Sequence, residues 1–259
     1  MTRNILRADP AGNITLFVLD PVPREERAEL AARLMALKEL GGEQVGFVCP
    51  PRGEGAGRME MMGGEFCGNA TRAFGMLLAR RLGRSGQVLV ETSGCQTPVE
   101  VYVDLEAGTA RSQMPLPQGV EQVSAAGLEG TLVHLGGIAH LVLEGAEPSL
   151  ESFEAAEPLL RAIPGLDAYG VIFLGEGGTM TPLVKVPATG TLVWEGSCGS
   201  GSLASAVAQS QGMEEGTLSR AYIQPAGVIL VQVTRRGGEV VQAHIGGTVI
   251  LGDPISVEL

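Results

Sequence analysis

The feature that most constrains this chain is a short motif that occurs twice, about half a chain length apart. CGNATRAF begins at Cys67 and CGSGSLAS begins at Cys198. Around these copies, VLVETSGC can be aligned with AYIQPAGV, and GNITLFVLD resembles GIAHLVLEG. Self-similarity of this kind indicates a duplicated structural unit. The sequence therefore predicts two related lobes, residues 1–118 and 119–252, with residues 253–259 able to return to the first lobe.

Each copy of the motif stands immediately before a predicted helix. After Cys67, apolar residues recur at helical spacing as far as Leu78, and Gly83 can end that helix. After Cys198, the segment SLASAVAQS carries no charge, so we expect it to be enclosed by other structure. Strand-like segments surround both helices, and amphipathic helices are predicted at 24–40 and 151–162. This pattern predicts an α+β fold.

Composition limits the partners. The net charge of −11 argues against nucleic acid or an anionic membrane, because both bind clustered Lys and Arg. No segment approaches the about 20 apolar residues of a membrane-spanning helix, and no secretory signal is evident, so we expect a cytoplasmic protein. The four cysteines lack the spacing of a disulfide framework or of a zinc site, and the sequence predicts no metal.

Two thiols at two helix starts favour proton transfer. Backbone N–H groups and the helix dipole can lower a thiol pKa from about 8.5 toward neutrality. With one thiol on each lobe, one can remove a proton from a tetrahedral carbon while the other returns a proton to the opposite face. That reaction is stereoinversion, as at the α-carbon of an amino acid. Amides at the helix starts could hold the substrate carboxylate and the developing enolate charge: Gly68, Asn69, Gly199 and Ser200.

Seven short motifs occur in order along the chain: PAGNIT, EQVGF, GGEFCGNAT, TSGC, QMP, WEGSCGSG and QPAG. With them the chain resembles the diaminopimelate epimerase superfamily of two-cysteine racemases and epimerases, and in particular the staphylopine-type histidine racemases of opine-metallophore biosynthesis. The resemblance implies two pseudo-symmetric lobes, each a curled sheet or barrel around a central helix. It also implies a small amino-acid substrate, no pyridoxal phosphate or other cofactor, and a homodimer.

The resemblance also assigns residues. It implies that Cys67 and Cys198 form the acid/base pair and that Asn13, Gln44 and Asn69 line the substrate site. It places Glu195 near the substrate amino group. Glu43, in the EQVGF motif, is a candidate to receive a basic or imidazole side chain.

Other readings stay open at this point. The chain lacks the ERGxGE-like and GNPH segments of diaminopimelate epimerases and differs from proline racemases around both cysteines, yet another epimerase of the superfamily is an alternative. A second alternative is a small-molecule binder or thiol redox sensor without enzyme activity. We expect Cys49 and Cys95 to be small buried residues, Glu65 to cap the first helix, and His140 to be a core or rim residue rather than a base.

Overall fold

The computed structural model describes residues 2–125 and 127–259. The chain forms two compact units, one made of Met1–Gln113 and Gly246–Leu259 and the other of Met114–Ile245. The first boundary therefore lies a few residues before the predicted 118, and the return to the first unit begins well before the predicted 253. Hydrogen bonds explain the early return, because the returning strand is bonded to the central helix of the first unit, as described below.

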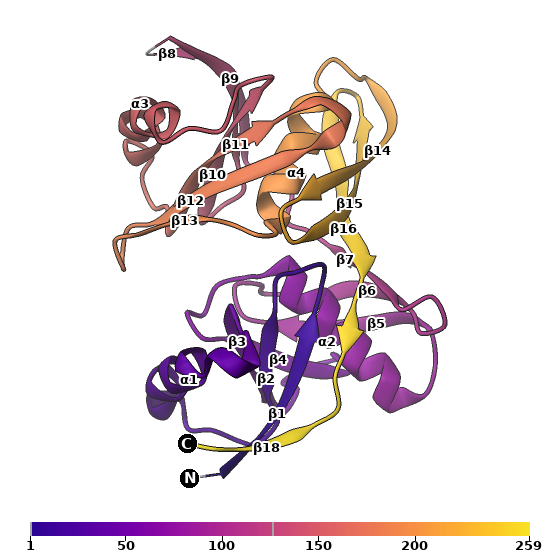
Figure 1. Ribbon diagram of the computed structural model, residues 1–259. Coiled ribbons are helices and arrows are strands. Elements are labelled where there is room, and N and C mark those ends of the chain that lie inside the picture. The colour runs from indigo at the N-terminus through magenta and orange to yellow at the C-terminus, as the bar shows by residue number, and fades with distance from the viewer. Residues whose placement is uncertain (1, 126) are drawn as a thin grey trace. The chain divides into compact units, whose positions relative to one another are not determined.

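The first unit is a mixed sheet with a helix on each face (Figure 1). Its strands are arranged in the order β7-β6-β5-β4-β3-β2-β1-β17, and β18 also pairs with β1. Its elements are β1 (Thr2–Asp9), β2 (Thr15–Val18), η1 (Arg24–Glu26), α1 (Arg27–Ala36), η2 (Lys38–Leu40), β3 (Gln44–Cys49), β4 (Gly57–Met61), α2 (Gly68–Leu82), β5 (Gly86–Thr92), β6 (Val99–Asp104), β7 (Thr109–Gln113), β17 (Ile250–Leu251) and β18 (Ile255–Glu258).

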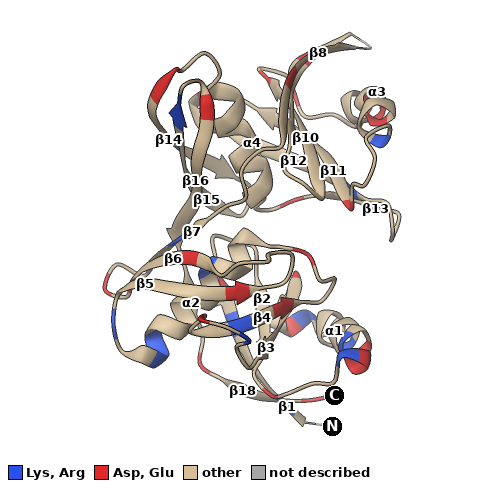
Figure 2. Ribbon diagram, turned by 180° about the vertical axis from the view of Figure 1, so that it is seen from behind, with Lys and Arg blue, Asp and Glu red and all other residues tan. Residues whose placement is uncertain are grey.

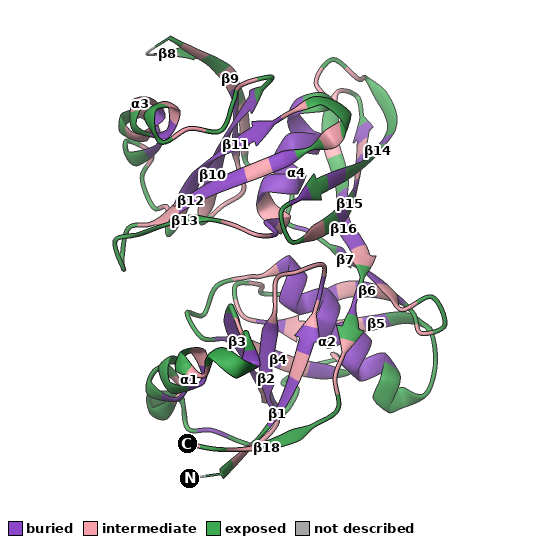
Figure 3. Ribbon diagram, in the orientation of Figure 1, coloured by how far each residue is buried: buried purple, intermediate pink, exposed green. Residues whose placement is uncertain are grey.

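Helix α2 packs on β4, β5, β6, β7 and β17, while α1 contacts β3. Twelve of the fifteen residues of α2 are buried. Figure 3 shows most of this helix in the colour of buried residues. Phe74 of this helix meets Phe17 of β2 with ring centroids 5.6 Å apart. Arg72 of the same helix donates hydrogen bonds to the carbonyl oxygens of Gly247 and Thr248 at 3.2 and 3.0 Å. These two bonds hold the returning strand in the first unit.

The second unit also encloses a helix. Its six-stranded sheet has the order β13-β12-β11-β10-β9-β8. Helix α4 contacts β9, β10 and β11 of this sheet as well as β14 and β15, and α3 contacts β9, β10 and β11. The elements are β8 (Gly119–Ala125), β9 (Leu128–His134), β10 (Ile138–Glu144), α3 (Leu150–Arg161), β11 (Ala168–Leu174), η3 (Glu176–Gly178), β12 (Met180–Val186), β13 (Thr191–Trp194), α4 (Gly199–Gln209), β14 (Glu215–Gln224), β15 (Gly227–Arg236) and β16 (Glu239–Thr248), whose last residues belong to the first unit.

Small side chains let strands approach both central helices closely. Eight of the eleven residues of α4 are buried, and Figure 2 shows that this helix carries no charged residue, whereas charges gather on α1 and at the end of α2. The prediction that the SLASAVAQS segment is enclosed is therefore confirmed. In α2, a Cβ added to Gly75 would lie 2.5 Å from Cγ1 of Val101 on β6. Glycine at this position therefore avoids a clash with Val101. The backbone conformation of Gly75 is helical and does not itself require glycine.

The structure confirms the predicted α+β fold and corrects its details. Among the described residues neither sheet closes into a barrel, since the strand order of each has two ends. The helix predicted over 24–40 is broken into η1, α1 and η2, because Leu37 leaves the helical region with ψ 90° and Gly41 ends the last turn in the left-handed conformation. None of the helices in the described part of the chain is long and apolar enough to cross a membrane.

We predict that Gly75→Ala destabilises the protein. Alanine gains about 1 kcal/mol over glycine in a helix interior, but overpacking against Val101 costs about 1–3 kcal/mol. The melting temperature should fall, as measured by circular dichroism. Gly53→Ala is the matched control, because its added Cβ would meet its nearest neighbour at 3.5 Å. A Gly75→Ala protein that melts at or above the parent temperature would show that helix propensity outweighs packing here.

Candidate active site

Cys67 is the N-cap residue of α2. Its backbone is extended, and its Sγ accepts a hydrogen bond from the Ala70 N–H at 3.5 Å. Its carbonyl oxygen accepts bonds from the N–H and the hydroxyl of Thr71 at 2.9 and 2.8 Å. The sulfur thus does what a serine or aspartate oxygen does at most helix starts. The prediction that Glu65 caps this helix is wrong, because Cys67 occupies the capping position.

A chain of side-chain hydrogen bonds leads away from Cys67. The side chain of Gln44, at the start of β3, forms a hydrogen bond with the Cys67 sulfur. Its Nε2 also donates to Asn13 Oδ1 at 2.6 Å and to Thr15 Oγ1 at 2.8 Å, and Asn13 Nδ2 donates to Glu43 Oε2 at 3.0 Å. Parallel pairing of β2 and β3 places Thr15 beside Gln44. The structure therefore brings together Asn13, Glu43, Gln44 and Cys67, which the sequence analysis had selected separately.

The turn before Asn13 is conformationally unusual. Ala11 has φ 59° and is the one non-glycine residue with positive φ among those described, and Gly12 follows with φ 91°. The Asp9 carboxylate accepts the Gly12 N–H at 2.7 Å and holds this turn. A left-handed alanine is strained and often marks a functional position. Here the turn carries Asn13 to the carboxylate of Glu43.

Burial raises the pKa of the Cys67 thiol, although the Ala70 N–H and the Gln44 side chain act in the opposite direction. The predicted lowering of this pKa is therefore wrong, because loss of water outweighs the helix-start donors. Burial also raises the pKa of Glu43, against the Asn13 hydrogen bond and with repulsion from Asp9. At neutral pH Cys67 is a protonated thiol, which suits a proton donor.

Asn69 is held by an arginine that the sequence analysis did not select. Asn69 is buried, and its Oδ1 accepts a bond from Arg72 Nε at 3.2 Å. Burial lowers the pKa of Arg72 to about 10, so its guanidinium remains cationic at neutral pH. The sequence did contain a sign of this role, because Arg72 is a single charged residue on the apolar face of the predicted helix. Arginine is rarely buried in proteins unless it has a partner. Its charge lies close enough to Cys67 for the two groups to interact electrostatically.

Cys198 repeats this arrangement in the second unit. It is the N-cap residue of α4, and its Sγ accepts the Gly201 N–H at 3.3 Å. Ser202 donates its hydroxyl to the Cys198 carbonyl at 2.7 Å, as Thr71 does for Cys67. The Ser200 hydroxyl lies 3.4 Å from Sγ. Both predicted helix-start cysteines therefore have the same local geometry.

Gln224 fixes the backbone of Cys198. Its Oε1 accepts the Cys198 N–H at 2.6 Å, and its Nε2 donates to Ser202 Oγ at 2.9 Å. Gln224 is not among the residues predicted from the sequence, although it begins the QPAG motif. Glu195, which is among them, is half-buried after β13, and its backbone N–H donates to the Pro182 carbonyl at 3.0 Å. Gly199 is the first residue of α4.

His140 lies inside the second unit, fully buried on β10. Burial lowers its pKa to about 3, so the imidazole is neutral at neutral pH. The expectation of a core residue is confirmed. Its Nε2 lies 2.9 Å from Ser200 Oγ, which links it to the surroundings of Cys198.

The remaining cysteines lie outside these networks. Cys49 is buried, as expected, and accepts a bond from Arg27 Nη2 at 3.4 Å. Cys95 is only half-buried, so the expectation of a buried residue is wrong for it, and it is one of the residues that line a cavity of about 530 Å³ in the first unit. Among the described residues, no group of three or more His, Cys, Asp or Glu side chains is placed to bind a metal ion.

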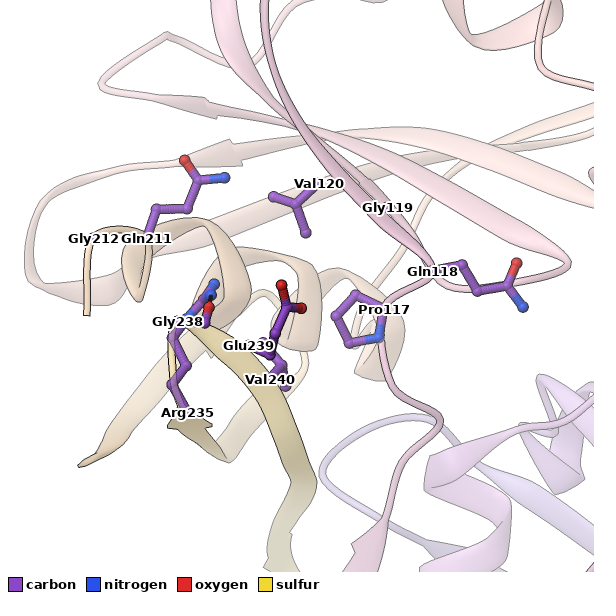
Figure 4. A pocket seen from close by; sticks show the side chains of 10 residues that line it. All are labelled: Pro117, Gln118, Gly119, Val120, Gln211, Gly212, Arg235, Gly238, Glu239 and Val240. Carbon is purple, nitrogen blue, oxygen red and sulfur yellow. Dashed lines mark hydrogen bonds between the residues drawn. The ribbon is translucent and has the colours of Figure 1, made fainter. Parts of the chain in front are cut away.

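A cavity of about 420 Å³ in the second unit (Figure 4) is lined in part by Gln211 and Gly212, which follow the C-terminal end of α4, whereas Cys198 precedes the helix. Arg235, one of its lining residues, donates to Ser210 Oγ at 3.0 Å and to the Val207 carbonyl at 3.3 Å. These bonds satisfy the last turn of the helix and explain the buried arginine. The cavity therefore lies at the C-terminal end of α4, and Cys198 is not among the residues that line it.

Comparisons with known proteins identify relatives of this chain. A family model described as the histidine racemase CntK N-terminal domain matches residues 4–252. The chain is similar to a histidine racemase of Fusobacterium nucleatum, with 30% identity over 213 residues and 78% of each chain covered. It is also similar to a histidine racemase of Staphylococcus aureus strain Mu50, with 27% identity over 251 residues and 91% of each covered.

Solved structures share the fold at low identity. A PhzF-family phenazine biosynthesis protein of Bacillus anthracis has a TM-score of 0.72, 16% identity and full coverage of both chains. A hydroxyproline epimerase of Agrobacterium vitis has a TM-score of 0.65 and 14% identity, with 99% of this chain and 92% of that one covered.

Fold and relatives together define the chain as an enzyme, an isomerase of the racemase and epimerase class. The predicted resemblance to histidine racemases is confirmed. Within this class, the chain belongs to the family described as the histidine racemase CntK N-terminal domain.

We predict that Cys67 reacts slowly with iodoacetamide at neutral pH. Because burial raises its thiol pKa, the thiolate fraction should keep rising beyond pH 9. The rate is followed by peptide mass spectrometry in a Cys198→Ser background. Gln44→Met should move the profile to still higher pH, because it removes a hydrogen bond that lowers the pKa. A rate that levels off below pH 8 would contradict the assignment of a protonated thiol.

Proposed function

We propose that this isomerase is a histidine racemase that uses Cys67 and Cys198 as its acid/base pair without a cofactor. The observation that carries the proposal is the matched geometry of the two cysteines, each of which caps a buried helix with its sulfur. Histidine is favoured as substrate because the similar proteins of Fusobacterium nucleatum and Staphylococcus aureus are histidine racemases.

In the proposed mechanism, the thiolate of one cysteine removes the α-proton of the bound amino acid. The electron pair left on the α-carbon delocalises onto the substrate carboxylate, as in an enolate. The other cysteine, as a thiol, gives its proton to the opposite face of the α-carbon and becomes the thiolate. The product has the opposite configuration, the two sulfurs have exchanged one proton, and the reverse reaction restores them.

Backbone amides supply the stabilisation that a thiolate alone lacks. The N–H groups at the starts of α2 and α4, from Gly68, Asn69, Gly199 and Ser200, are assigned to the substrate carboxylate and to the negative charge that develops on it. Each well-placed donor of this kind lowers a barrier by about 3 kcal/mol. A site without bulk water strengthens these interactions, so we infer that the enzyme closes around its substrate.

Glu43 is the proposed recognition group for the imidazole. Its carboxylate accepts a hydrogen bond from Asn13, and burial raises its pKa. A carboxylate in this environment is a strong acceptor for an N–H of the substrate. Glu195 is assigned to the substrate ammonium group. We further infer a cytoplasmic homodimer whose product serves opine-metallophore biosynthesis.

Exchange of the α-proton tests the mechanism. In deuterium oxide without pyridoxal phosphate, the reduced protein should exchange the α-proton of L-histidine, as followed by NMR. Cys67→Ser and Cys198→Ser should each abolish the exchange. Cys95→Ser is the matched control and should retain it, because Cys95 caps neither α2 nor α4. Exchange that survives in Cys67→Ser would rule out the two-thiol mechanism.

The same experiment separates the alternatives. No exchange with any amino acid would favour a binder or a thiol redox sensor, and exchange with proline or diamino acids alone would favour another epimerase.

Glu43→Gln tests the choice of substrate. Loss of a charge-assisted hydrogen bond costs about 1.5–3 kcal/mol, so kcat/KM for histidine should fall about 10- to 100-fold. Exchange with alanine, which has no imidazole, should change much less. Glu39→Gln on η2 is the control, because that residue is exposed. Equal losses for both amino acids would show that Glu43 does not recognise the imidazole.

A further inference from the structure

Beside Cys198, the structure contains a hydrogen-bonded chain of three side chains that differs from the surroundings of Cys67. Cys198 Sγ lies 3.4 Å from Ser200 Oγ, and Ser200 Oγ lies 2.9 Å from His140 Nε2. The corresponding position after Cys67 holds Asn69, which Arg72 binds instead. The helix-start backbone was thus repeated, but the residue two positions after each cysteine has a different partner.

The direction of these hydrogen bonds follows from the burial of His140. Its Nδ1 is buried and has no hydrogen-bond partner among the described residues. The ring packs against β11, where a Cβ on Gly170 would lie 3.1 Å from Nδ1. A buried N–H without an acceptor is rarer in proteins than a buried acceptor without a donor. The ring proton is therefore assigned to Nε2, which donates to Ser200 Oγ and leaves the serine proton free to point at the sulfur.

We infer that His140 and Ser200 form a relay of donors that stabilises the thiolate of Cys198, with His140 acting as a positioning residue. The inference deepens the proposed racemase function, because it rests on Cys198 being one of the two proton-transfer groups. A hydroxyl aimed at a charged sulfur makes a charge-assisted bond, which is stronger than a neutral one. Together with the Gly201 N–H, Sγ then has two donors within 3.4 Å.

No titratable residue is paired with His140 on the neighbouring strands. The residues paired with His140 on the neighbouring strands are Val133 and Gly170, and neither titrates. Because its pKa lies at about 3, the ring cannot carry a proton to or from substrate at neutral pH. Its contribution is the fixed direction of the Ser200 hydroxyl.

Two titratable groups on the strands packed against α4 bind the C-terminal end of this helix. Tyr222 donates to Gln209, and Arg235 donates to Ser210, so both hold the last turn of the helix rather than its start. Glu195 is the carboxylate nearest to Cys198 in sequence. Since Glu195 stays unchanged in every variant of the test below, its influence cancels from the comparison.

The pH profile of Cys198 alkylation by iodoacetamide tests the relay. It is measured on the full chain in a Cys67→Ser background, without substrate, with peptide mass spectrometry to follow Cys198. Ser200→Ala should move the midpoint up by about one pH unit, because a hydrogen bond to a charged group is lost. Ser200→Thr should keep the parent midpoint. Ser205→Ala removes a buried hydroxyl one turn later on the same helix and is the matched control, expected to leave the midpoint unchanged.

His140 is tested with two variants. His140→Phe should raise the midpoint as Ser200→Ala does, and His140→Gln, whose amide can place an N–H near the Nε2 position, should restore most of it. An unchanged midpoint in Ser200→Ala overturns the relay. A shift in Ser200→Ala without one in His140→Phe also overturns it, because the hydroxyl would then act alone. If His140→Phe does not fold, as judged by its melting curve, Ser200→Ala and His140→Gln decide.

The alkylation result is independent of turnover. A shifted midpoint in a protein that exchanges no α-proton would support the relay and reject the racemase. Exchange of the α-proton with an unshifted midpoint would do the reverse.

Discussion

The interaction on which the rest of the structure depends is the hydrogen bond from a helix N–H to a cysteine sulfur. Both central helices are buried, so the N–H groups of their first turns have little access to water and need acceptors within the protein. Sγ of Cys67 and Sγ of Cys198 supply one acceptor each, at 3.5 and 3.3 Å. The atoms assigned to proton transfer are therefore the atoms that start the two helices, which fixes their positions without any further device.

The two sulfurs have the same helix-start geometry but differ in their side-chain surroundings. In the proposed mechanism, one sulfur begins as a thiolate and the other as a thiol in each direction of the reaction. Around Cys67, burial raises the thiol pKa while Gln44 and the Ala70 N–H oppose this effect. Around Cys198, the Ser200 hydroxyl lies at the sulfur and Gln224 binds the backbone N–H. The repeated motif therefore gives both sulfurs the same helix start, and the flanking residues give them different side-chain partners.

Elements that depend on neighbouring residues could be predicted from the sequence. The helices after Cys67 and Cys198 could be predicted because their apolar spacing and flanking glycines act over a few residues. The exact partners of distant segments could not be predicted: a return of residues 253–259 to the first lobe was expected, but neither segment carries a pattern that pairs β18 with β1. For the same reason Arg72 and Gln224 were missed, since their partners lie on other elements. Cys67 shows a second limit, because the balance between burial and helix-start donors depends on packing that a motif does not record.

Arg72 shows how the frame tolerates a costly group. Its guanidinium is fully buried, forms no ion pair with a carboxylate in the described part of the chain, and leaves Nη2 without a hydrogen-bond partner there. Burial of an unpaired charge costs several kcal/mol. The two carbonyls of the returning strand and Asn69 Oδ1 offset part of this cost. A positive charge near Cys67 also favours its thiolate, which burial disfavours. The same arginine therefore joins the end of the chain to α2 and reduces the penalty for charging the sulfur that α2 holds.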